Sequence, residues 1–194
     1  MDDQTIRLYD TRAQDYRKAV AKDDDALLTA FIEAISPGGR VLDLGCGPGH
    51  GAAHMAKAGL NVDAVDASAS MVALARQHPG VQAWQATFND LTDQSVYDGI
   101  WANFSLLHAR RDDLPTHLNA IHAALKPEGR FTMAVKAGTG ERRDDLGRYY
   151  SYYTQEELTA LLGAAGFKVA KIATGRGKGL DGAMANWISV TSYE

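Results

Sequence analysis

The stretch VLDLGCGPGH, residues 41–50, decides the fold of this chain. Its apolar start predicts a buried strand, and its glycines predict a tight turn that leads into a helix. Asp43 lies within that strand, where a buried carboxylate is costly unless a partner satisfies it. Glycines let a ligand approach the backbone closely, and ligands of open α/β sheets bind at the carboxyl ends of the strands. The stretch therefore predicts a ligand site in which a cationic ligand group, or alternatively the loop amides, satisfies Asp43.

Short apolar runs alternate with helical segments after residue 40. Strands are expected at residues 41–45, 62–67, 81–86, 98–104, 130–136, 167–173 and 186–193. Helices are expected at residues 49–58, 68–78, 112–125 and 154–165, the last with a capping box formed by Thr154 and Glu157. Strands joined by such helices favour parallel βαβ units, whereas the glycine-rich loop at 175–185 favours an antiparallel last pair. The expected fold class is α/β, a three-layer αβα sandwich around a doubly wound, mostly parallel seven-stranded sheet with an antiparallel last strand.

The segment before residue 40 predicts helices. Apolar residues recur at helical intervals over residues 3–20, and the acidic run at 23–25 provides a cap for a second helix over residues 26–35. Residues 36–39 read Ser-Pro-Gly-Gly and end that helix. We expect a single domain over residues 1–194, with N-terminal helices in 1–36 and a Rossmann-like core in 40–194.

Composition limits the classes of protein that fit. The chain has 194 residues, 45% of them hydrophobic and 23% charged, which indicates one globular domain. A net charge of −4 gives no basic field for a nucleic acid, and one cysteine cannot form an internal disulfide. The polar start MDDQTIRLYD argues against a targeting peptide. The sequence has no apolar run of about 18 residues, so it predicts no membrane span. These features favour a cytoplasmic protein without nucleic-acid or membrane partners.

A second candidate site residue ends the second predicted strand. Asp66 follows Gly45 by about 20 residues, the spacing at which an acid meets a ribose diol in dinucleotide-binding folds. Its carboxylate offers two acceptor oxygens for the two ribose hydroxyls. The alternative is that Asp66 caps the helix that begins near Ser68.

The series of motifs resembles the class I S-adenosylmethionine-dependent methyltransferases over residues 40–194. The matching positions are the glycine-rich motif of Asp43, Gly45, Gly47 and Gly49, the acid Asp66 followed by Ala67, Ser68 and Met71, and the segments 86–91, 97–103, 106–108 and 125–130. The sequence departs from the family at Thr87, where Asp is common, and at Glu128, where Gly is usual. The departure at Thr87 weakens or changes the contact expected with the adenine amine.

The resemblance implies that the cofactor is S-adenosylmethionine and that the product is S-adenosylhomocysteine. The residues that it assigns to the cofactor are Asp43, Gly45, Cys46, Gly47, Asp66, Ala67, Met71, Thr87, Phe88 and Asn103. We interpret Cys46 as a small turn residue and not as a nucleophile. A sulfonium makes its methyl carbon electrophilic, so positioning the acceptor in line supplies much of the acceleration.

The acceptor side is predicted less directly. His108 is the candidate general base, with the alternative that it only packs beside or orients the cofactor. Arg148 and Tyr149 belong to a segment rich in Arg and Tyr, residues 141–153, which suits an anionic or aromatic acceptor. The alternative is a solvated charged loop with packed tyrosines. The resemblance also implies that the N-terminal helices, with Tyr9, fold over the cofactor as a lid.

The predicted function is methyl transfer to a small-molecule acceptor by in-line displacement, and the acceptor and the oligomeric state stay open. A non-catalytic S-adenosylmethionine-binding or regulatory module is the main alternative. An RNA methyltransferase and an NAD(P)-dependent oxidoreductase are weaker ones, because the chain has no basic appendage and His50 breaks the dinucleotide fingerprint that begins at Gly45. His50 and His54 are spaced as a metal pair, but no second pair of ligands accompanies them, so no metal is predicted.

Overall fold

The structure is a computed structural model that describes residues 2–20 and 25–194, without the side chains of residues 19 and 20. A seven-stranded sheet forms its centre, in the order β3-β2-β1-β4-β5-β9-β8. The strands are β1 Arg40–Leu44, β2 Asn61–Asp66, β3 Val81–Gln85, β4 Tyr97–Asn103, β5 Leu125–Lys136, β8 Lys168–Lys178 and β9 Met184–Tyr193. Strands β1 to β5 are parallel, and β9 is antiparallel to both of its neighbours. The predicted fold class and the reversed last strand are confirmed.

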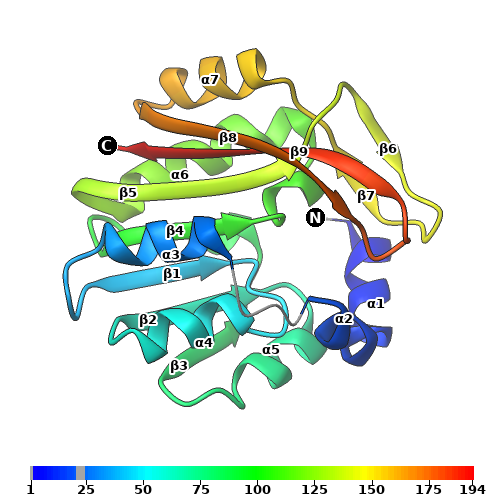
Figure 1. Cartoon of the computed structure of the whole chain (residues 1–194), viewed down its shortest axis with the longest axis horizontal. Helices are drawn as coiled ribbons and strands as arrows, with labels where there is room; N and C mark the ends of the chain where they lie inside the picture. The colour runs from blue at the N-terminus through cyan, green and yellow to red at the C-terminus, as the bar shows by residue number, and fades with distance from the viewer. Residues whose placement is uncertain (1, 21–24) are drawn as a thin grey trace.

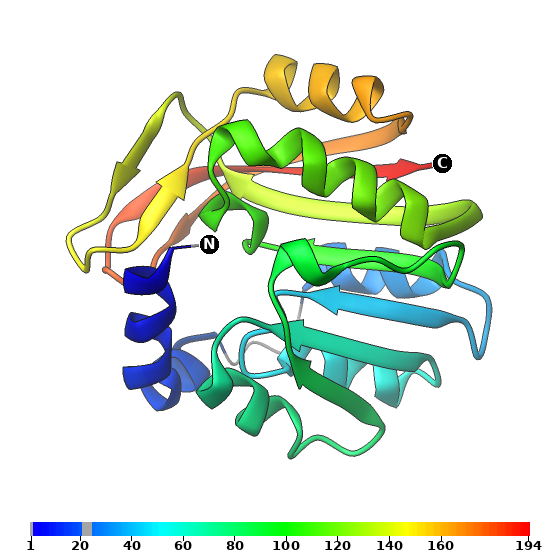
Figure 2. The same cartoon turned by 180° about the vertical axis from the view of Figure 1, so that it is seen from behind.

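Helices cover both faces of this sheet (Figures 1 and 2). On one face, α3 (Ala26–Glu33) and α4 (His50–Lys57) pack with Val41 and Trp101. On the other face, α6 (Leu114–Ala124) and α7 (Gln155–Ala164) pack with Leu42 and Phe131. Helix α5 (Ala69–Ala75) lies next to α4. Apolar burial on both faces is what a parallel sheet requires, because its strands have no solvent side.

The N-terminal segment forms two helices, α1 (Asp3–Thr11) and α2 (Ala13–Val20), and not the one helix predicted over residues 3–20. The Thr11 hydroxyl donates to the carbonyls of Arg7 and Leu8, and side-chain bonds of this kind often bend helices. Both helices lie across the carboxyl ends of the central strands (Figure 1). Of the acidic run predicted to cap the next helix, Asp25 caps α3 by accepting from two backbone amides, and positions 23 and 24 lie outside the described residues.

Two segments predicted as loops contain strands. The glycine-rich segment 175–185 is largely a hairpin, because β8 and β9 extend into it. Gly175 has no β-carbon, and one placed there would collide with the indole of Trp187 on β9, so glycine is what this pairing needs. Residues 141–151 contain a second hairpin of β6 (Glu141–Arg143) and β7 (Tyr149–Ser151). Both hairpins extend beyond the carboxyl ends of the parallel strands and border the site described below (Figure 1).

Local signals at two other positions are informative. The capping box of Thr154 and Glu157 at the start of α7 is confirmed. Glu128, where the resembled family usually has Gly, adopts a left-handed φ of 62°, which explains why glycine is the common residue at this turn. None of the helices in the described residues is long and apolar enough to cross a membrane.

Candidate active site

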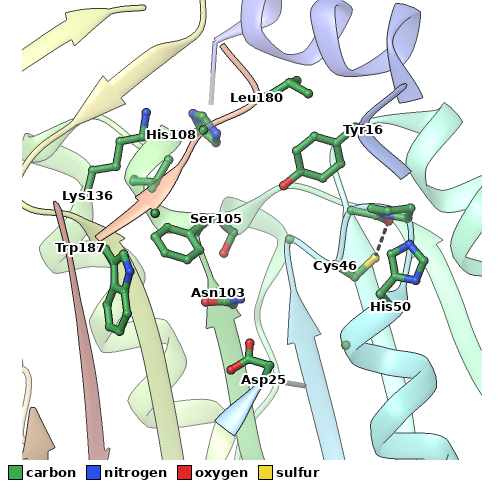
Figure 3. Close-up of a pocket in the computed structure, with 18 of the residues that line it drawn as sticks. Tyr16, Asp25, Cys46, His50, Asn103, Ser105, His108, Lys136, Leu180 and Trp187 are labelled. Atoms are coloured by element: carbon green, nitrogen blue, oxygen red, sulfur yellow. Dashed lines mark hydrogen bonds between the residues drawn. The ribbon is translucent and has the colours of Figure 1, made fainter. Parts of the chain in front are cut away.

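A cavity of about 1100 Å³ opens at the carboxyl ends of the parallel strands. Its lining includes the glycine-rich loop, the last residues of β2, β4 and β5, the N-terminal helices and the β8–β9 hairpin. Cys46 and His50 lie on one side of it and Lys136 and Trp187 on the other, with Asn103 between them (Figure 3). Pockets for a single small ligand hold roughly 300–1,000 Å³, so this cavity lies just above that range.

The glycine-rich loop forms the first wall as the sequence predicts. Gly45, Gly47 and Gly49 all have positive φ, at 82°, 52° and 84°. A β-carbon on Gly45 would collide with Ser105, and one on Gly49 would lie 2.8 Å from the Ala75 backbone. Gly47 has open space, with only a Tyr16 ring carbon within 4 Å of such an atom. Packing therefore requires glycine at the first and third positions, while Gly47 turns its backbone toward the cavity.

Asp66 ends β2 and joins the glycine loop to α5. One carboxylate oxygen accepts from the Gly47 amide and the other from the Ser68 amide, each at 2.9 Å. The cap of α5 is Ser68, whose hydroxyl accepts from the Met71 amide at 3.1 Å, so the interpretation of Asp66 as that cap is wrong. Burial raises the pKa of Asp66. Each of its oxygens keeps acceptor capacity and the residue lines the cavity, which is the geometry a ribose diol needs.

Asp43 adds a second buried carboxylate to this wall. It is 4% exposed and lines the cavity. Its pKa is raised to about 7, because burial raises it strongly and the nearby Asp66 charge adds to this, while a hydrogen bond from the Ala52 amide lowers it. This amide belongs to the first turn of α4 and not to the glycine loop, and it leaves the carboxylate strongly destabilised as a charge. A cationic ligand group in the cavity would stabilise it.

Asn103 supplies an unpaired acceptor at the end of β4. Its Oδ1 atom is buried and has no hydrogen-bond partner among the described residues. The side chain lines the cavity between Ser105 and Asp25 (Figure 3). Buried polar atoms are nearly always paired in folded proteins, so this oxygen is suited to an N–H donor of a ligand.

His108 lies opposite the glycine loop in a short chain of hydrogen bonds. Its Nδ1 is 2.7 Å from the Tyr149 carbonyl and its Nε2 is 2.8 Å from the Tyr9 hydroxyl. A carbonyl only accepts, so Nδ1 carries the proton and Nε2 accepts from Tyr9. Burial lowers the pKa of His108 to about 4 and raises that of Tyr9, so both groups are neutral near pH 7. Arg148 donates to the same Tyr9 oxygen at 3.2 Å.

Arg148 does not lie free on the rim, as the prediction of an acceptor-binding arginine required. It lines the cavity but is only 2% exposed, and its Nε and Nη2 donate to Asp144 Oδ2 at 2.8 and 2.6 Å. Its charge is therefore already compensated. Arg142 and Arg143 lie on exposed β6, outside the cavity lining, and Arg142 stacks on Tyr152 at 3.7 Å. The ion pair with Asp144 leaves Arg148 no free charge for an anionic acceptor, which removes the expected anion site there.

The structure separates the other predicted residues into two groups. Cys46 and Met71 line the cavity, and burial raises the pKa of the Cys46 thiol, as expected of a turn residue that is no nucleophile. The residues that do not line it are Ala67, Thr87, Phe88 and Tyr149. Thr87 binds Asp90 through its amide and its hydroxyl, both at 2.7 Å. Phe88 is 6% exposed and packs in the core. Their roles toward a ligand stay predictions.

Sequence reasoning assigned neither Lys136 nor Trp187 to the site and interpreted Asp25 only as a helix cap, whereas all three line the cavity. Lys136 had a usable signal, since a lysine closes an otherwise apolar predicted strand that ends at the ligand-binding edge. Trp187 had none, because it reaches the cavity through a pairing of distant strands.

The comparisons with known proteins agree with this geometry. The family described as "Methyltransferase domain" matches residues 41–129, which include the glycine loop, Asp66, Asn103 and His108. Both this match and the similar proteins described below support the resemblance to the class I S-adenosylmethionine-dependent methyltransferases. This family takes its methyl group from S-adenosylmethionine, so the comparisons support the predicted family and its cofactor.

The similar proteins differ in what they methylate. Malonyl-[acyl-carrier protein] O-methyltransferase of Pectobacterium atrosepticum is 35% identical over 112 residues, 57% of this chain and 43% of that protein. Ubiquinone/menaquinone biosynthesis C-methyltransferase UbiE of Rubrivivax gelatinosus is 40% identical over 108 residues, 52% of this chain and 41% of that protein. The chain thus matches less than half the length of these curated relatives.

A solved structure covers more of the chain. The 1,6-didemethyltoxoflavin-N1-methyltransferase of Burkholderia thailandensis, with bound 1,6-didemethyltoxoflavin and S-adenosylhomocysteine, has a TM-score of 0.74 and 27% identity. The match covers 97% of this chain and 87% of that one. The similarity therefore includes the N-terminal helices and the final hairpin that border the cavity.

Proposed function

We propose that this protein transfers the methyl group of S-adenosylmethionine to a small-molecule acceptor bound in the same cavity. The observation that carries the proposal is the division of the cavity into two chemically different halves. One half contains the carboxylates of Asp25, Asp43 and Asp66, and the other contains Lys136 with the hydroxyl and imidazole of Tyr9 and His108. S-adenosylmethionine carries a sulfonium and an ammonium group, so the acidic half suits it.

In the cofactor half, Asp66 would accept from the ribose hydroxyls, and Gly47 would let the ligand lie against the backbone. Asp43 and the unpaired Oδ1 of Asn103 would receive the positively charged amino-acid end. Met71, which is 1% exposed at the start of α5, would pack under the adenine. Helices α1 and α2 would form the lid that the resemblance implies. The bound S-adenosylhomocysteine of the Burkholderia neighbour supports this use of the fold.

In the acceptor half, Tyr9 and His108 would remove a proton when the acceptor has one to lose. The Tyr9 oxygen would take the proton of the acceptor while the Tyr9 hydroxyl proton passes to His108 Nε2 along the existing 2.8 Å hydrogen bond. A histidine with a pKa of about 4 is a weak base. The pair therefore suits a proton that becomes acidic as the new bond to the methyl group forms and positive charge develops on the acceptor.

Calorimetric titration with S-adenosylmethionine, S-adenosylhomocysteine and NAD tests the proposal. We expect both sulfur-containing ligands to bind and NAD to bind at least about a hundredfold more weakly, because the acidic half repels a pyrophosphate. Tight NAD binding with no S-adenosylmethionine binding would overturn it. Mass spectrometry of the purified protein for retained cofactor gives an independent readout. Stoichiometric cofactor binding with no turnover on any acceptor would instead favour the non-catalytic module.

A further inference from the structure

Lys136 is a half-buried cation without a compensating charge. It ends β5 and lines the cavity, with its Nζ 4.0 Å above the ring centroid of Tyr150. None of the described carboxylates forms an ion pair with it. Asp144, one of the acids whose field reaches it, is already bound to Arg148, and Asp181 acts only at longer range. Burial lowers the pKa of Lys136, which a bound anion would reverse.

Trp187 provides a flat apolar surface beside this cation. It is the register partner of Lys136 across β5 and β9, and partners in an antiparallel pair point to the same face of a sheet. Figure 3 shows the two side chains next to each other on one side of the cavity. Gly175 pairs with Trp187 from the other neighbouring strand, and its missing β-carbon lets the indole lie against the backbone. The indole is thus supported from behind and partly open toward the cavity.

Phe104 adds a second aromatic ring to the lining. It directly follows β4 with a φ of 53°, a left-handed conformation that is unusual for a residue with a β-carbon. It is 36% exposed, one of few large apolar side chains in the described residues that are. Backbone strain that exposes an aromatic ring to a cavity is typical of a functional position and gives no packing benefit.

We infer that the acceptor half binds a planar aromatic or heteroaromatic anion, whose ring stacks on Trp187 and Phe104 and whose negative group pairs with Lys136. This inference rests on the proposed function and names the acceptor class for that site. Lys136 also lies near the proposed proton-accepting pair, because the Tyr150 ring that contacts Lys136 lies 4.6 Å, centroid to centroid, from His108. A ring held at Lys136 therefore reaches toward Tyr9 and His108. The anion site expected at Arg148 moves to Lys136.

The test uses the intact protein saturated with S-adenosylhomocysteine, which fills the cofactor half. Calorimetry then compares two probes of the same shape, 2-naphthoate and the neutral 2-naphthamide. We expect 2-naphthoate to bind about tenfold more tightly, the contribution of one partly desolvated ion pair. In Lys136→Met this preference disappears while 2-naphthamide binding is retained, and in Lys136→Arg it persists. In Trp187→Leu both probes bind about fivefold or more weakly, because the stacking surface is lost.

Lys171→Met is the matched control, since Lys171 lies exposed on β8 outside the cavity lining and its removal should change neither affinity. Equal affinity for the two probes, or an unchanged preference in a folded Lys136→Met protein, overturns the inference. The titration with S-adenosylhomocysteine distinguishes failure of the proposed function from failure of this acceptor class. Absence of S-adenosylhomocysteine binding rejects the proposed function, whereas cofactor binding without any preference for the anionic probe rejects this acceptor class alone.

Discussion

Replacing Asp43 by Asn should stabilise the unliganded protein while it weakens cofactor binding. Asp43 is 4% exposed, and burial raises its pKa from 3.8 to about 7. Between these two values the folded protein holds a proton that the unfolded chain has released. Its contribution to stability is therefore present at low pH and is lost as the pH rises toward the folded pKa. Asn keeps an oxygen that accepts from the Ala52 amide but has no charge to bury.

The size of the effect follows from the shift. A group that binds one more proton when folded lowers the free energy of unfolding by about 1.4 kcal/mol per pH unit across this window. The shift of roughly three units therefore amounts to about 4 kcal/mol, of which about 2 kcal/mol falls between pH 5 and pH 7. Asp43→Asn should gain stability relative to the wild type by these amounts as the pH increases.

Urea denaturation of both unliganded proteins at pH 5, 7 and 8 measures the difference directly. Asp112→Asn, the same chemical change on the exposed 3₁₀ turn that precedes α6, is the control and should follow the wild type. At pH 8 calorimetry should show S-adenosylhomocysteine binding at least about tenfold more weakly to Asp43→Asn, because its ammonium group loses a charged partner. Parallel pH dependence of stability in the wild type and Asp43→Asn would refute the reasoning.

Three further substitutions test other parts of the site. Asp66→Ala should weaken cofactor binding by about one to two decades in calorimetry, and unchanged affinity in a folded protein would show that this acid only orders the loop. Tyr9→Phe should lower turnover on an acceptor that loses a proton by about a hundredfold with cofactor affinity unchanged, and wild-type turnover would exclude the pair with His108. Arg148→Ala leaves the buried Asp144 carboxylate without its cationic partner and should cost about 3–5 kcal/mol in urea denaturation. A variant of full stability with a changed KM for the acceptor alone would restore the rim-binding interpretation.

Local chemistry explains what the sequence predicts well. The left-handed backbone at Gly45, Gly47 and Gly49 needs glycine wherever it occurs, so the loop is visible in the sequence before any contact is known. Asp66 can also be identified from the sequence alone, because it ends an apolar run at a characteristic distance from the glycine loop. Strands buried on both faces give continuous apolar runs, which is why the alternation of strands and helices along the chain can be predicted.

Features that depend on distant partners are not visible in this way. The run RRDDLGR, residues 142–148, has the composition of a solvated loop, yet Asp144 and Arg148 bury each other within it. The glycines of residues 175–179 argue against a strand locally, and only the indole of Trp187 explains why β8 needs one of them. Thr87 and Phe88 matched a family pattern by position, but their side chains are held by Asp90 and by the core.

Helix α1 is hydrogen-bonded to both walls of the cavity, so its position affects both. Asp10 accepts from the Ser68 hydroxyl at 2.6 Å and from the Ser70 amide at 3.0 Å, so it holds the start of α5 beside Asp66. The preceding residue, Tyr9, holds His108 in the opposite wall. Because neighbouring residues of one short helix make both sets of bonds, α1 cannot move away from one half without releasing the other. The start of α5 and the imidazole of His108 are therefore both tied to α1, so a displacement of this helix would disturb the two walls of the cavity together.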